Sequence, residues 1–121
     1  MYNDDRPIYI EGKCVCVYCG FDGRNSVLAW HQLLIDHVIS LRCKGGEREH
    51  SILNVRENKV VACYTCNNIK RVWDKKYEDH PERPLPERVV EARRSAKEYI
   101  LSRYTLDADF EPMMDEINRV A

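Results

Sequence analysis

The sequence contains no apolar run long enough to cross a membrane. Stretches such as Leu33-Leu34-Ile35 are short, whereas a membrane-spanning helix needs about 20 apolar residues. The N-terminus, Met1 to Arg6, has no basic segment followed by an apolar one, so no secretory signal is visible. Internal repeats and low-complexity tracts are missing as well. We therefore expect a cytoplasmic protein whose 121 residues form one domain, with an appendage at most.

The chain also lacks a large net charge. Its 19 basic and 20 acidic residues nearly cancel, which argues against a protein that binds every polyanion. The charges are unevenly placed, because residues 40–76 carry nine basic and four acidic side chains. Such a segment favours a local contact with a phosphate backbone. A solvated charged surface would give the same composition, so both interpretations stay open.

The order of polar and apolar residues predicts strands followed by a helix. Residues 8–18 alternate loosely and predict a strand that enters the first cysteine pair. Residues 33–39 are apolar and β-branched, which predicts a second strand. From residue 64 to residue 77 there is no glycine or proline, and a helix is the best prediction.

A proline-rich segment separates this region from the C-terminal part of the chain. Pro81, Pro84 and Pro86 predict a stiff linker, and Pro86 can begin a helix that runs to about Tyr104. A shorter amphipathic segment closes the chain. We divide the sequence into a domain over residues 1–78 and a helical extension over residues 79–121.

Two cysteine pairs with the same spacing carry the strongest chemical signal. Cys16-Val17-Tyr18-Cys19 and Cys63-Tyr64-Thr65-Cys66 are separated by 43 residues. Each pair can supply one edge of a tetrahedral zinc site, so we predict a structural Zn²⁺ held by four thiolates. The alternatives are a redox dithiol and unligated core cysteines. The surplus Cys14 and Cys43 are expected to be small buried residues.

Several short motifs occur in a defined order around these cysteines. They are Cys16-x-x-Cys19, Asp36-His37-Val38-Ile39, Gly45-Gly46, Asn58-x-Val60-x-Ala62 and Cys63-x-x-Cys66-Asn67-x-x-Lys70. This order resembles the HNH endonucleases, which are zinc-containing members of the ββα-metal nuclease group. The resemblance implies an α+β fold with a small ββα-metal core, a four-cysteine zinc site and a C-terminal helical extension. The chain departs from the family pattern at Ser40, where proline is common, and in a longer loop before Asn58.

The resemblance also implies a role for individual residues. The family's His, Asn and final Asn fall on His37, Asn58 and Asn67. His37 would be the general base, and Asn58 would hold the loop that orients it. Asp36 and Asn67 would hold a catalytic Mg²⁺ or Mn²⁺, because carboxylate and amide oxygens are hard ligands. DNA would be the substrate.

Four basic residues are candidates for contact with DNA phosphates. Lys70 and Arg71 follow Asn67 by about one helical turn, and Arg42 and Lys44 lie on the opposing loop. A solvated charge is the alternative for each. A non-catalytic zinc module that binds nucleic acid or protein, and a structural zinc domain in a larger complex, remain the competing functions. Neither would need Asp36-His37 or Asn67.

Overall fold

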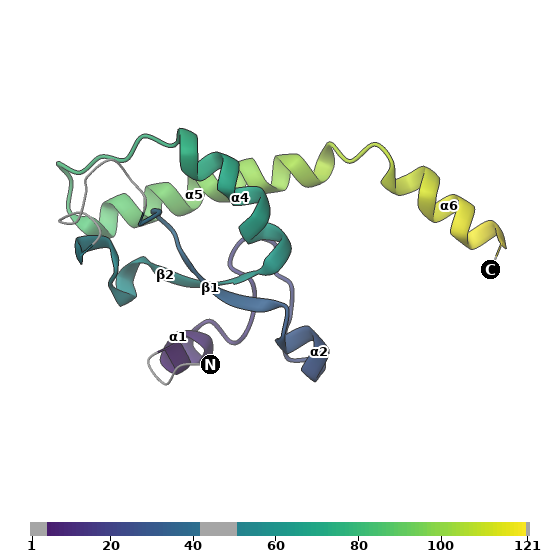
Figure 1. Ribbon diagram of the computed structural model, residues 1–121, viewed down its shortest axis with the longest axis horizontal. Helices are drawn as coiled ribbons and strands as arrows, with labels where there is room; N and C mark the ends of the chain where they lie inside the picture. Colours follow the sequence, from purple (N-terminus) through teal and green to yellow (C-terminus); the bar gives the residue numbers. More distant parts are fainter. Residues whose placement is uncertain (1–4, 42–50, 121) are drawn as a thin grey trace.

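The computed structural model describes residues 5–41 and 51–120, which form a small α+β fold (Figure 1). This confirms the predicted fold class. Within the described ranges, no helix combines the length and the apolar character needed to cross a membrane. The elements are α1 (Arg6–Glu11), α2 (Val27–Trp30), β1 (Leu33–His37), the 3₁₀ helix η2 (Arg56–Asn58), β2 (Lys59–Cys63), α4 (Tyr64–Lys76), α5 (Leu85–Thr105) and α6 (Phe110–Val120).

The sheet consists of β1 and β2, which pair in antiparallel fashion. Leu33 lies opposite Cys63 at one end, and His37 lies opposite Lys59 at the other. Helix α4 follows β2 without a loop, because Cys63 ends the strand and caps the helix. This direct junction fixes the second cysteine pair at the start of α4, next to the end of the sheet.

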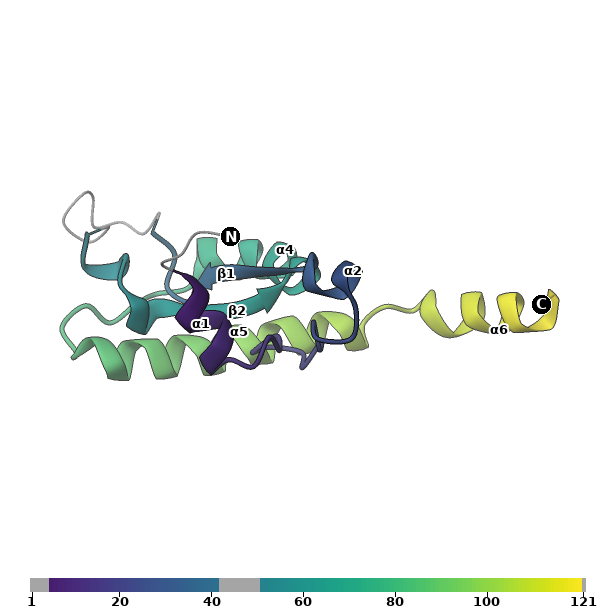
Figure 2. The ribbon, with the colours of Figure 1, turned by 90° about the horizontal axis from the view of Figure 1, so that it is seen from below.

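Helix α5 belongs to the same hydrophobic core as the sheet and α4. Its buried residues Val89, Ala92, Ala96 and Ile100 join the core cluster, and the small alanine side chains allow α5 to lie close to α4. Figure 2 shows α5 running alongside the sheet. Helix α5 is therefore part of the packed core.

Helix α6 differs from α5 because none of its residues belongs to the core cluster. It extends beyond the rest of the molecule (Figures 1 and 2), and none of its residues is buried. Phe110, Met113, Ile117 and Val120 are all exposed. The amphipathic segment predicted at the end of the chain is therefore a helix that leaves its apolar side uncovered.

The strand predicted over residues 8–18 is wrong. The structure has helix α1 in the first half of this range, and Lys13 and Cys14 then turn the chain with positive φ angles of 55° and 54°. Pro7 in the first turn favours a helix because its fixed φ suits that position and its missing N–H is not needed there. The loose alternation of apolar residues was too weak to outweigh this local signal.

Candidate metal centre and active site

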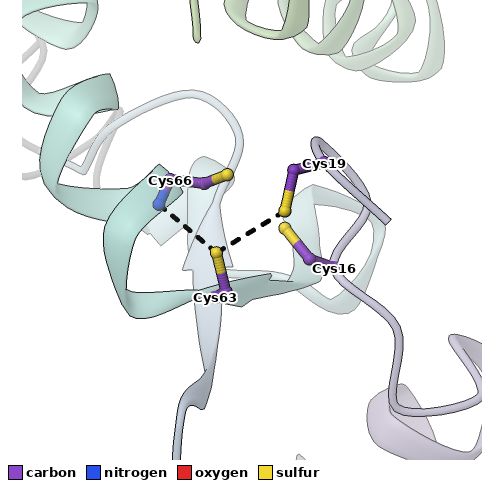
Figure 3. A group of neighbouring side chains, drawn as sticks. All are labelled: Cys16, Cys19, Cys63 and Cys66. Carbon is purple, nitrogen blue, oxygen red and sulfur yellow. Dashed lines mark hydrogen bonds between the residues drawn. The ribbon is translucent and has the colours of Figure 1, made fainter. Parts of the chain in front are cut away.

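The four predicted zinc ligands converge at one point. The Sγ atoms of Cys16, Cys19, Cys63 and Cys66 all lie within 4.8 Å of one another, as Figure 3 shows. Zn–S bonds of about 2.3 Å in a regular tetrahedron place the sulfurs about 3.8 Å apart. The Sγ atoms of Cys19 and Cys63 are 3.7 Å apart. Among the described residues this is the cluster that can hold a metal ion, and its donor set and size fit Zn²⁺.

Local backbone structure explains how each pair presents its thiols. In the second pair, Sγ of Cys63 accepts a hydrogen bond from the backbone N–H of Cys66 at 3.4 Å, which caps the first turn of α4. In the first pair, the N–H of Gly20 donates to the carbonyl of Cys16 at 2.9 Å. Gly20 has φ of 80°, a conformation that favours glycine because it has no Cβ. Glycine at this position therefore relieves the tight backbone after the second thiol of the pair.

The thiols of the cluster share their protons unequally. Hydrogen bonds from Cys63 and Cys66 lower the pKa of Cys16, while the bond with Cys16 is the main cause that raises the pKa of Cys66. Burial raises the pKa of Cys19 to about 11. A bound Zn²⁺ would favour the thiolate form of all four groups, because only deprotonated sulfur ligates the metal.

Asp36 lies in the interior, on the side of β1 that faces α4. Its side chain is only 8% exposed. The Tyr18 hydroxyl donates to Oδ2 at 2.8 Å, and the Lys70 ammonium lies 3.4 Å from the same oxygen. Burial raises the pKa of Asp36, and the positive charge of Lys70 opposes that shift. The carboxylate is thus held in place by one phenol and one cation.

Lys70 is fully buried, which is at odds with its predicted contact with DNA phosphate. Its Nζ donates to Oδ1 of Asp74 at 2.6 Å and to the carbonyl of His37 at 3.1 Å. The physical reason is helical periodicity, since residues one turn before and after it, Cys66 and Trp73, also face the core. Lys70 therefore acts inside the protein, as the counter-ion of Asp36 and Asp74.

Removing the charge of Lys70 should destabilise the protein strongly. We expect Lys70→Met to lower the free energy of unfolding by about 3 kcal/mol at pH 7, because it leaves two carboxylates without their buried partner. The pKa values of Asp36 and Asp74 are already raised by burial. Protonation of these groups favours the folded state, so the loss should shrink as the pH falls.

Urea denaturation at pH 7 and pH 5 measures this effect. Lys76→Met on the exposed side of the same helix is the matched control and should change the stability little at either pH. An equal loss of stability at both pH values would contradict the role of Lys70 as a counter-ion.

His37 points toward a different part of the structure from Asp36. Its Nε2 lies 3.0 Å from Oδ1 of Asn54, and the residue is partly exposed. Neighbouring residues in a strand point to opposite faces, which is why Asp36 and His37 meet different surroundings. The two adjacent side chains therefore have separate partners, although Lys70 touches the His37 carbonyl and the Asp36 carboxylate alike.

Asn58 links the chain just after His37 to the segment around Leu53. Its Oδ1 accepts from the N–H of Ile39 at 2.9 Å. Its Nδ2 donates to the carbonyls of Ile39 and Leu53, both at 2.9 Å. The side chain is fully buried, and all three bonds go to backbone. These three bonds tie the backbone at Ile39 to the backbone at Leu53.

Loss of the Asn58 side chain should therefore cost stability. We expect Asn58→Ala to lower the free energy of unfolding by about 3 kcal/mol, because three buried backbone groups lose their partners. Thermal or urea denaturation measures the change. Asn25→Ala, at an exposed position, serves as the control with an expected change below about 0.5 kcal/mol. Similar curves for the two variants would refute the assignment.

Asn67 lines an open pocket on the surface of α4. The pocket has a volume of about 490 Å³, and its other lining residues are Ser40, Arg71, Asp74 and Lys75. Arg71 and Lys75 are exposed, which places two positive charges at the pocket. Arg42 and Lys44, the other two predicted phosphate contacts, lie outside the described residues.

Sequence reasoning missed four residues of this region. Tyr18 contacts Asp36, and Asp74 contacts Lys70. Asn54 contacts His37, and Lys75 lines the pocket. The i, i+4 spacing of Lys70 and Asp74 was a readable signal for an ion pair. No comparable signal points to Tyr18, because its contact with Asp36 joins residues that only the fold brings together.

A two-stranded sheet that leads directly into a helix, with four clustered cysteines next to the junction, defines a small α+β domain that can hold a metal ion. Residues 16–72, slightly less than half of the chain, match the family model described as HNH endonuclease. The match includes both cysteine pairs, Asp36-His37, Asn58 and Asn67. Comparisons with curated proteins and with solved structures gave no match.

Proposed function

We propose that this protein is a metal-dependent DNA endonuclease that hydrolyses phosphodiester bonds. One observation carries the proposal: the segment that matches the HNH endonucleases places Asp36-His37 at the end of β1, beside the helix that carries Asn67. The cysteine cluster at the start of α4 supports this arrangement, because it fixes the backbone directly before Asn67.

In this proposal Asp36 and Asn67 hold the catalytic cation. The donor chemistry suits Mg²⁺ or Mn²⁺, because both side chains offer hard oxygen atoms. Among the described residues, the contacts of the Asp36 carboxylate fall on Oδ2, which leaves Oδ1 as the coordinating oxygen. Asp74 balances the charge of Lys70, so the buried group keeps one net negative charge. When bound, the cation would neutralise charge that develops on the phosphate.

His37 is the proposed general base, and Asn54 defines which of its nitrogens can act. The Asn54 Oδ1 atom lies next to Nε2, and an amide oxygen can only accept a hydrogen bond. Nε2 therefore carries the proton, and Nδ1 keeps the lone pair that can take a proton from the attacking water. Imidazole is the side chain most often used for proton transfer near neutral pH.

The pocket beside Asn67 is the proposed place for the DNA backbone. Arg71 and Lys75 are four residues apart on one helix, so both charges can reach the same strand. Contacts of this kind position a phosphate without reading the base sequence. In this proposal Arg71 contacts the DNA phosphates, and Lys75 does so in place of the buried Lys70.

A non-catalytic zinc module that binds nucleic acid or protein is the second candidate function. The specific observation in its favour is the ion pair between Lys70 and Asp36, because an ammonium beside a carboxylate opposes the binding of a second cation there. Binding of DNA without cleavage in Mg²⁺ and in Mn²⁺ would favour this module over the endonuclease.

Cleavage of a supercoiled plasmid over a range of Mn²⁺ concentrations tests the proposal. The wild-type protein should convert the plasmid to nicked or linear forms. Asn67→Ala should need a higher Mn²⁺ concentration for the same rate, because one metal ligand is lost. Asn68→Ala, at the next position of the helix, is the matched control and should behave as the wild type. Identical Mn²⁺ dependence of both variants would remove Asn67 from the metal site.

A further inference from the structure

Tyr104 reaches the cysteine cluster from a distant part of the chain. It lies in the last turn of α5, and its hydroxyl oxygen is 3.1 Å from Sγ of Cys66. The two residues are 38 positions apart, and Tyr104 is outside the segment that matches the HNH family. Cys66 is fully buried, so the hydroxyl covers a sulfur that has no access to water.

The chemistry of the two groups sets the direction of this hydrogen bond once a metal is bound. A cysteine that ligates zinc is a thiolate and has no proton to give. The tyrosine side chain carries a phenolic O–H that stays protonated near neutral pH. The hydroxyl therefore donates, and the sulfur accepts.

The packing of α5 fixes where this hydroxyl lies. Nε1 of Trp73 on α4 donates to Oγ of Ser95 on α5 at 3.0 Å, and Arg88 forms a buried ion pair with Asp79. Ala96 and Ile100, in the turns that lead to Tyr104, are fully buried. The core therefore holds the end of α5 in place, and this places the Tyr104 hydroxyl next to Cys66.

We propose that Tyr104 is a positioning residue of the metal centre, whose hydroxyl donates a hydrogen bond to the Cys66 thiolate and thereby makes α5 part of the zinc site. The bond withdraws charge from the sulfur and holds it in its ligating orientation. The inference rests on the metal site formed by the four cysteines and does not depend on DNA cleavage.

Substitution by Co²⁺ gives a direct spectroscopic test. Loss of the hydrogen bond in Tyr104→Phe raises the energy of the sulfur electrons, so the sulfur-to-cobalt charge-transfer band should move to longer wavelength. Zinc should also pass faster to a competing chelator, because loss of a group that supports a metal ligand typically lowers the metal affinity by about 10-fold or more. Tyr99→Phe, on the same helix and partly buried, is the control and should leave both measurements unchanged.

The outcomes separate this role from simple packing. An unshifted charge-transfer band together with an unchanged rate of zinc transfer in Tyr104→Phe would overturn the proposal. Should that variant fail to load metal, 3-fluorotyrosine at position 104 keeps the hydroxyl and makes it a stronger donor. The band should then move to shorter wavelength, and a shift to longer wavelength or no shift would overturn the proposal. None of these measurements requires DNA, so they are independent of the proposed nuclease activity.

Discussion

Cys63→Ser is expected to leave the protein largely unfolded at 25 °C. Cys63 supplies one of the four sulfurs, ends β2 and caps α4, so its loss affects the metal site and the strand–helix junction together. Structural zinc contributes on the order of 10 kcal/mol to small domains, which is comparable with the whole stability of such a domain. Far-UV circular dichroism and metal analysis should show loss of helix signal and less than one zinc per chain.

Cys14→Ser is the matched control for this experiment. Cys14 is a free, half-buried cysteine outside the cluster, so its replacement should leave one zinc per chain and the helix signal intact. A folded Cys63→Ser protein without zinc would show that the metal is dispensable. Equal effects of the two substitutions would mean that thiol chemistry in general, and not this site, maintains the fold.

His37→Ala is expected to reduce the rate of plasmid cleavage by about 10²- to 10⁴-fold, the usual contribution of a general base. The side chain is partly exposed and its contact is with the exposed Asn54, so the variant should keep its fold and its zinc. Single-turnover cleavage with saturating protein measures the chemical step separately from DNA binding.

His31→Ala provides the comparison for His37. His31 is exposed at the end of α2, and its removal should leave the cleavage rate unchanged. Circular dichroism and zinc content of both variants show whether either change acts through the fold. Nicking by His37→Ala at the wild-type rate would remove it from the role of base.

Much of the metal centre could be read from the sequence because its determinants are local. The C-x-x-C spacing places two thiols on one edge of a tetrahedron by itself, and the helix over residues 64–77 follows from the absence of glycine and proline. The structure confirms both, with α4 ending at Lys76. The strand over residues 33–39 was found for the same reason and begins at Leu33.

Other predictions depended on which face of an element the core covers. Lys70 and Arg71 are adjacent and equally basic in the sequence, yet Lys70 is fully buried and Arg71 is exposed. A helix turns by 100° per residue, so neighbours meet different surroundings. The sequence alone could not say which of the two would face the interior, because that depends on how α4 packs against the sheet and α5.

The amino-acid sequence by itself determined the four candidate sulfur ligands, the match of the central segment to a known family and the position of the main helix. These features rest on spacings within a few residues, which covalent geometry and helical periodicity control. The tertiary structure decided the partners of Asp36, the burial of Lys70 and the approach of Tyr104 to Cys66. Each of these joins residues far apart in the chain, and only the packing of α4 and α5 around a shared core brings such groups within bonding distance.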